Sequence, residues 1–196
     1  MPFPYYARLS ARQKQIYRAS DAITAVVLSG VEALRPAVDE LERALAAADR
    51  RAVEAACRRL ATGICAALGV PEVKVRVLAA RPSGPHEELH GLYEPEPPPA
   101  RITLWMRTAA KKQVVAFRSF LRTLVHELLH HLDYELYRFE ETFHTEGFFA
   151  RESSLARQLL GEPPPPAEPP RRGPAQSQRR KSPASKPSQS RQGSPT

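Results

Sequence analysis

The sequence contains no apolar run of 18 residues, the length at which a hydrophobic stretch becomes a candidate membrane-spanning helix. We therefore expect neither a membrane-spanning segment nor a membrane partner. The first residues also lack the basic region and continuous apolar stretch of a secretory signal. Together these absences predict a cytoplasmic protein.

Cysteine is scarce, because only Cys57 and Cys65 occur. They lie eight positions apart on a predicted helix, too far along its axis to bond to each other. They also form no CxxC pair of the kind that indicates a zinc knuckle. We expect both to be buried as small hydrophobic side chains.

Aromatic residues are absent after Phe149, and half of the prolines, ten of twenty, fall within 162–196. This segment also carries seven lysines and arginines against two glutamates. It cannot bury enough apolar surface to offset its chain entropy, so we predict a disordered tail. Its basic residues would neutralise phosphates, which predicts a DNA contact. The alternative is a solubilising tail, since it offers no aromatic ring for base stacking.

The pattern HExxH occurs twice, at 86–90 and at 126–130. On a helix, residues four apart share one face, so His126 and His130 can present two imidazoles to the same metal ion. Glu127 lies beside them as a carboxylate that need not coordinate the metal, and it is the candidate catalytic base. His144 follows at a distance that suits a third ligand from the next element.

Context separates the two copies. The first is bracketed by Pro82-Ser83-Gly84-Pro85 and Gly91, which leaves no room for a stable helix, so we expect a loop or the start of a strand over 89–93. The second lies in a stretch with the i, i+3, i+4, i+7 apolar spacing of a buried amphipathic helix, expected over about 113–137. The second copy is therefore the predicted site.

The remaining pattern predicts an α+β fold. Ser10 and Gln13 resemble a capping box, which predicts a helix to about Ser29 with Gly30 as its stop. The other expected elements are a helix carrying Val38, Leu41 and Leu45, a helix from an Asp49 cap to Leu68, strands over 73–77 and 101–106, the motif helix, and a closing helix over 148–160. We divide the chain into an N-terminal helical part (1–70) packed on a core (71–161), followed by the tail (162–196).

A small sheet ahead of an HExxH helix, followed by a later ligand, resembles the zincin metallopeptidase fold. The stretch Phe143-His144-Thr145-Glu146-Gly147-Phe148 resembles the third-ligand region of SprT-like and WLM-type peptidases, in which an aromatic residue follows the histidine. The resemblance covers about 72–160. It implies His126, His130 and His144 as ligands of one zinc ion, Glu127 as the catalytic residue, and a protein or peptide substrate. SprT-like enzymes also act on proteins crosslinked to DNA, which would suit the basic tail.

Two family features are missing from this chain. Many SprT-like proteins carry a cysteine-based zinc ribbon after the catalytic domain, and no cysteine follows Cys65. The extended metzincin motif is also absent, because Asp133 and Leu136 stand where its glycine and third histidine would be. The resemblance is therefore to the zincin group as a whole more than to either subgroup.

Several roles stay open at the level of sequence. Glu146 or Glu152 is the alternative third ligand, and these two carboxylates with Asp133 are candidate acceptors for the outer ring nitrogens of the ligands. Tyr134 shares a face with His130 and either stabilises an oxyanion or packs in the core.

Two functions compete with a general peptidase. One is a non-catalytic regulatory or binding module in which zinc only stabilises the fold. The other is a peptidase that cleaves one dedicated regulatory partner, as ImmA-like zincins are thought to do. The carboxylate of Glu127 favours an enzyme, because a purely structural zinc site has no need of it.

Overall fold

Five α-helices and a three-stranded sheet make up the part of the chain that the computed structural model describes, residues 3–80 and 90–163. The α+β class predicted from the sequence is confirmed. The elements are η1 (Pro4–Arg8), α1 (Ala11–Ala22), η2 (Val31–Leu34), α2 (Arg35–Ala46), α3 (Arg50–Leu68), β1 (Lys74–Ala80), β2 (Gly91–Glu94), β3 (Arg101–Arg107), α4 (Phe117–Glu135) and α5 (Glu146–Leu160). These residues belong to one compact unit. The predicted disordered tail from residue 164 and the first HExxH copy up to residue 89 lie outside the described residues.

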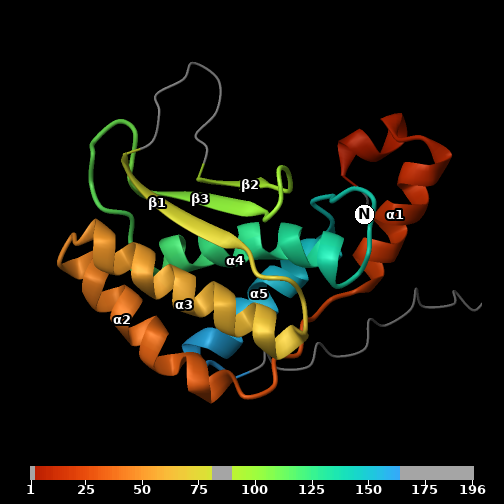
Figure 1. Cartoon of the computed structure of the whole chain (residues 1–196). Coiled ribbons are helices and arrows are strands. Elements are labelled where there is room, and N and C mark those ends of the chain that lie inside the picture. Colours follow the sequence, from red (N-terminus) through yellow and green to blue (C-terminus); the bar gives the residue numbers. More distant parts are fainter. Residues whose placement is uncertain (1–2, 81–89, 164–196) are drawn as a thin grey trace, which may run out of the picture. The chain divides into compact units, whose positions relative to one another are not determined.

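The sheet has the strand order β1-β3-β2, with β1 parallel and β2 antiparallel to β3. In β1 the valines Val75 and Val77 are buried and alternate with exposed Lys74 and Arg76, as predicted. Figure 1 shows α2, α3, α4 and α5 on one side of the sheet, with α3 packed on β1 and α4 packed on β2 and β3. The core therefore lies between the sheet and these two helices, and α4 runs beneath the edge strand β2.

Local sequence signals explain where α3 begins and ends. The side chain of Asp49 accepts hydrogen bonds from the backbone N–H groups of Arg51 and Ala52, at 3.0 and 3.1 Å. Gly69 ends the helix with a φ of 65°, a left-handed conformation that favours glycine. Cys57 and Cys65 are unpaired and buried on the inner face of this helix, as predicted.

The helix that opens with the Ser10 capping box ends at Ala22, seven residues before the predicted end. Ser10 and Gln13 do form the reciprocal bonds of the box. The stretch Ile23–Ser29 is rich in β-branched residues, which have a low helix propensity. Its backbone groups bond to a side chain of α5 in place of helical partners. The Gln158 side chain accepts from the Leu28 N–H at 3.1 Å and donates to the Val26 carbonyl at 2.6 Å.

The motif helix also begins later than predicted, at Phe117 in place of about residue 113. The preceding residues extend the sheet, because Val114 pairs with Arg107 and the Val115 N–H donates to the Met106 carbonyl. The apolar spacing in the sequence does not reveal that residues 114 and 115 can pair with the end of β3. The closing helix begins at Glu146, two residues earlier than predicted, with Thr145 as its N-cap.

A buried ion pair joins three parts of the chain. Arg151 of α5 and Asp133 of α4 are both fully buried, with a 2.8 Å bond from Arg151 Nη2 to Asp133 Oδ1. The same guanidinium donates to the carbonyls of Ser20 and Ile23, at 2.6 and 2.8 Å, and to the Ser20 hydroxyl. The side chain of Arg151 therefore holds α4, α5 and the end of α1 together.

No helix among residues 3–80 and 90–163 is both long enough and apolar enough to cross a membrane. This agrees with the absence of long apolar runs in the sequence.

We predict that Arg151→Met lowers the free energy of unfolding by about 3–5 kcal/mol, because it leaves the Asp133 carboxylate buried without its cation. Urea denaturation measures the change. Arg157→Met on the same helix is the matched control and should cost less than about 1 kcal/mol. Equal losses in the two variants would show that the buried pair does not hold the fold.

Candidate metal centre

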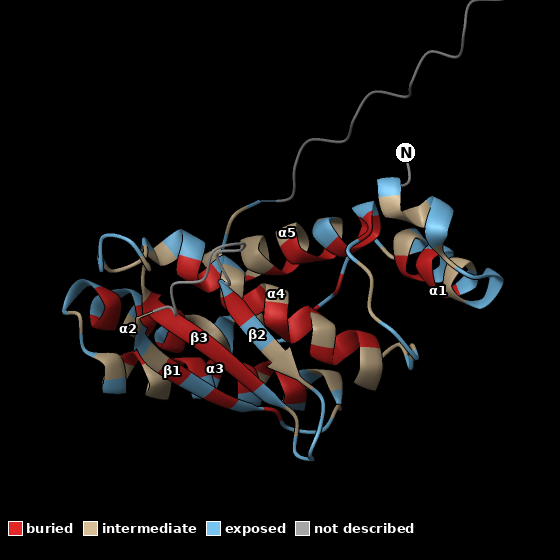
Figure 2. Cartoon of the chain, turned by 90° about the horizontal axis from the view of Figure 1, so that it is seen from above, coloured by how far each residue is buried: buried red, intermediate tan, exposed pale blue. Residues whose placement is uncertain are grey.

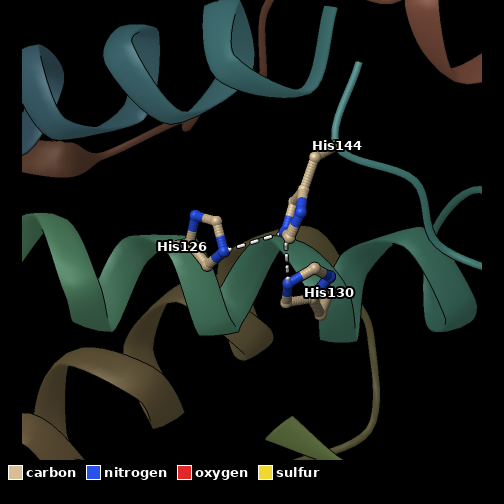
Figure 3. A group of neighbouring side chains, drawn as sticks. All are labelled: His126, His130 and His144. Carbon is tan, nitrogen blue, oxygen red and sulfur yellow. Dashed lines mark hydrogen bonds between the residues drawn. The ribbon is translucent and has the colours of Figure 1, made fainter. Parts of the chain in front are cut away.

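Three histidine side chains converge on one point beside α4 (Figure 3). His126 and His130 lie one turn apart on the same face of the helix, and His144 reaches them from the loop between α4 and α5. The Nε2 atom of His144 lies 3.0 Å from Nε2 of His126 and 3.2 Å from Nε2 of His130. The structure thus brings together the three residues that the sequence singled out as ligands.

The outer ring nitrogen of His126 has a carboxylate partner. Its Nδ1 lies 2.8 Å from Oε2 of Glu152, and a carboxylate can only accept, so Nδ1 carries the proton and donates. The other oxygen of Glu152 accepts from Arg122 Nε. Burial of Glu152 acts to raise its pKa, but its bonds to His126 and Arg122 outweigh this and lower it. Glu152 therefore orients His126 from outside the centre and is not in the ligand position.

The outer nitrogen of His130 is fixed through a hydroxyl. The Thr142 hydroxyl donates its proton to Oδ2 of Asp133 at 2.8 Å. It can therefore only accept a hydrogen bond from Nδ1 of His130, which lies 2.9 Å away. Nδ1 of His130 is then the protonated nitrogen. The buried pair of Asp133 with Arg151 anchors this chain of bonds.

The proton positions leave the Nε2 atoms of His126 and His130 with free lone pairs directed into the cluster. Zinc–nitrogen bonds of about 2.0–2.1 Å in tetrahedral geometry place two ligand nitrogens about 3.3 Å apart. The separations of 3.0 and 3.2 Å from His144 to the other two histidines are close to that value, and all three ligand atoms lie within 4.8 Å of one another. The three residues therefore fit a zinc ion, although imidazole suits several other divalent metals too.

Burial favours the neutral, metal-binding form of two of the histidines, His130 and His144. Burial lowers the pKa of His130 to about 3, and the neighbouring His126 and His144 add to this effect. Burial likewise lowers the pKa of His144. Neutral imidazoles need not lose a proton before they bind a metal at neutral pH.

Glu127 lies between α4 and the edge strand β2 and is only 6% exposed. A Cβ atom on Gly91 would overlap its carboxylate and would lie 2.6 Å from its Cγ, so glycine at this position leaves the room that Glu127 occupies. Burial raises the pKa of Glu127 to about 7, although the nearby His126 acts to lower it. A carboxyl with this pKa can take up and release protons near neutral pH.

A cavity of about 310 Å³ opens onto the centre, and its wall includes Glu127, the three histidines and residues of β2. Tyr134 lines it as well, stacked at 6.0 Å on the ring of Tyr93. The cavity therefore gives a small molecule or a chain segment access to both the carboxylate and the imidazoles.

Two other candidate side chains near the motif lie apart from this group. His131 points away from it, with its Nε2 bonded to the Pro71 carbonyl at 2.8 Å and its Nδ1 accepting from the Tyr93 hydroxyl at 3.2 Å. Glu146 is the exposed first residue of α5 and does not join the histidines, which form the convergent group found in the described part of the chain.

Sequence reasoning did not find Thr142, Arg122 or Gly91 as parts of this centre. No motif marks them, because each acts through a contact with a residue that lies far away in sequence. Glu152 was among the candidate acceptors for a ligand histidine, and the structure shows it in contact with His126.

No family model matches the chain, and the comparisons with curated proteins and with solved structures likewise find no match. Any inference about the function of this centre therefore rests on its geometry.

We predict about one zinc ion per purified chain and a marked loss of zinc in His144→Ala, since that change removes one of three ligands. Elemental mass spectrometry of both proteins, prepared in parallel, gives the stoichiometry. His90→Ala, which changes a described histidine outside the cluster, should keep the wild-type content. Equal zinc in the wild type and His144→Ala would remove His144 from the ligand set.

Burial of Glu127 predicts a pH effect on the metal-free protein. Its folded-state pKa of about 7 exceeds the ordinary value of 4.5, so between these values the unfolded chain loses this proton first and stability falls as the pH rises. Metal-free Glu127→Gln should therefore be more stable than the wild type at about pH 8, by up to about 3 kcal/mol, and no more stable at about pH 4. Urea denaturation in the presence of a chelator measures both; a difference that does not depend on pH would contradict the raised pKa.

Proposed function

We propose that the protein is a zinc-dependent metallopeptidase of the zincin type, similar to the SprT-like and WLM-type group, which hydrolyses peptide bonds in a protein or peptide substrate. One observation carries the proposal. Three imidazoles, whose ligand atoms lie within 4.8 Å of one another, converge on the same cavity that the buried carboxylate of Glu127 lines. A purely structural site would need the imidazoles but not the carboxylate.

His126, His130 and His144 would hold the ion, and three protein ligands leave one position of a tetrahedral site open. When bound, zinc supplies a Lewis acid that polarises a carbonyl and makes a water molecule more acidic. Glu152 and Thr142 keep the first two imidazoles turned toward the ion by accepting their outer N–H groups.

Glu127 is the proposed general base. Its carboxylate would accept a proton from the attacking water and deliver it to the amine that leaves. Burial under β2 suits this role, because it excludes bulk water from the carboxylate and brings its pKa to about 7. Gly91 contributes by leaving space for the side chain.

The edge strand β2 offers a way to bind an extended substrate. It stands at the end of the strand order, and within the described residues only β3 pairs with it. Leu92 and Tyr93 of this strand line the cavity. A peptide that added itself to this edge would run past Glu127 and the histidines with its backbone groups paired. Tyr134 faces the same cavity and is a candidate donor to the oxyanion.

Contact with DNA through the basic tail stays a prediction from the sequence, since residues 164–196 lie outside the described part of the chain.

Glu127→Gln should abolish hydrolysis, with a loss of at least about 10²-fold, while zinc content stays at the wild-type level. Digestion of casein and of a mixed peptide library, followed by mass spectrometry, measures cleavage. The amide keeps the size of the side chain but cannot act as a base.

The same experiment separates the alternatives. Activity that survives in Glu127→Gln would refute the mechanism. A zinc-loaded wild type that cleaves neither casein nor the library would contradict a general peptidase and leave a dedicated substrate or a non-catalytic module.

A further inference from the structure

We propose that residues 3–22, which form η1 and α1, are a clamp that holds His144 at the metal centre and thereby sets the affinity for the metal. The inference rests on the proposed zinc site and assigns a role to the N-terminal segment, which carries no motif. It makes Tyr5 and Arg12 positioning residues, which act through the loop that bears His144.

The clamp contributes little to the main core. In the described part of the chain the core cluster begins at Val26, and the buried residues of α1 are Ile16, Tyr17 and Ser20. Figure 1 shows α1 at one end of the folded unit, apart from α2, α3 and the sheet and next to the loop that follows α4. Figure 2 shows the same separation from a second direction, and most of the clamp is not deeply buried. It packs on the loop and on α5.

Polar contacts from the clamp reach successive residues of the loop. The Arg12 guanidinium binds both carboxylate oxygens of Glu140, and the Gln13 amide donates to the carboxylate of Glu141 at 3.0 Å. The Tyr5 hydroxyl donates to the backbone carbonyl of His144 itself, at 2.7 Å. The Arg12–Glu140 pair is exposed and contributes little alone, so the bond from Tyr5 is the more important of the two.

An aromatic cluster closes the space between the clamp and the loop. Tyr17 is almost fully buried, and its ring lies 6.0 Å from Tyr5 and 6.2 Å from Phe143, the residue before His144. Tyr5 also stacks on Phe143 at 6.5 Å. The residue that precedes the ligand is therefore packed against the clamp.

The end of α1 fixes the start of α5 in the same way. Asp21 accepts a hydrogen bond from the Gly147 N–H at 3.0 Å. A Cβ on Gly147 would overlap the backbone of Asp21, so the two segments are in direct contact. The loop thus meets the clamp at residues 140, 141, 143 and 144, and again at Gly147 just inside α5.

The three ligands differ in what holds them. His126 and His130 stand on a packed helix whose inner face is buried, whereas His144 is the most exposed of the three and lies on a loop. A free loop would lose conformational entropy when its histidine bound a metal. A loop already held in place loses less, so the clamp should strengthen binding without touching the ion.

The test compares two matched double variants of the full chain. Tyr5→Phe with Arg12→Ala removes one hydroxyl and one guanidinium that reach the loop. Tyr6→Phe with Arg18→Ala removes the same groups from the same segment, where they bond to each other and not to the loop. Zinc affinity is measured by competition with a chromophoric chelator, the ligand set by the absorption spectrum of the Co²⁺-loaded protein, and the fold by the Tm of the metal-free protein.

We expect the clamp variant to bind zinc at least about tenfold more weakly, as is typical when groups that orient a ligand are removed. Its Co²⁺ spectrum should shift toward that of His144→Ala, while its metal-free Tm stays close to that of the control variant. The control should keep wild-type affinity and spectrum. Equal affinity in the two double variants would overturn the inference.

A second comparison tests whether the effect passes through His144. Once His144→Ala has removed the ligand, adding Tyr5→Phe and Arg12→Ala should weaken zinc binding no further. An undiminished additional loss would show a general structural effect and overturn the inference. These readouts do not involve hydrolysis, so a protein that binds zinc but cleaves nothing would refute the peptidase alone. A wild type that binds no metal would refute both.

Discussion

A guanidinium that has no access to water sets the arrangement of this molecule. Arg151 is fully buried, so the donors of its guanidinium depend on acceptors inside the protein. Nη1 and Nη2 bond to Asp133 and to the end of α1, at Ser20 and Ile23, whereas Nε has no partner in the described part of the chain. These partners belong to α4 and to the end of α1, so the bonds of this one buried side chain position α1, α4 and α5 together.

The proposed metal centre depends on the same bonds. Asp133 accepts from Thr142 with the oxygen that Arg151 leaves unused, and Thr142 in turn accepts from His130. One side of the centre is thus connected to the buried ion pair by two further hydrogen bonds. The other side depends on Glu152, which lies one residue after Arg151 on α5 and accepts from His126. A single turn of α5 orients both histidines of the motif.

The third ligand is held differently. His144 lies on a loop that residues 3–22 contact from a segment apart from the main core, and Thr142 joins the same loop to Asp133. The centre therefore combines two ligands held by a packed helix with one held by a smaller, more exposed assembly. This division explains why a proposed enzyme of this size would keep an N-terminal helix that adds little to its core.

Sequence alone was sufficient where the information is local. The spacing of His126 and His130 with the apolar pattern around them identified the motif helix, and the Asp49 cap marked the start of α3. These signals come from residues within a few positions of each other, which a regular helix places on one face or at one end. Only the tertiary structure decided features that depend on contacts across more than a hundred residues. These are the end of α1 at Ala22, which α5 determines, and the bond from Tyr5 to His144. At these positions, side chains of other segments compete with the local backbone preference. Their positions follow from the packing of the whole chain, and the periodicity of one segment carries no information about that packing.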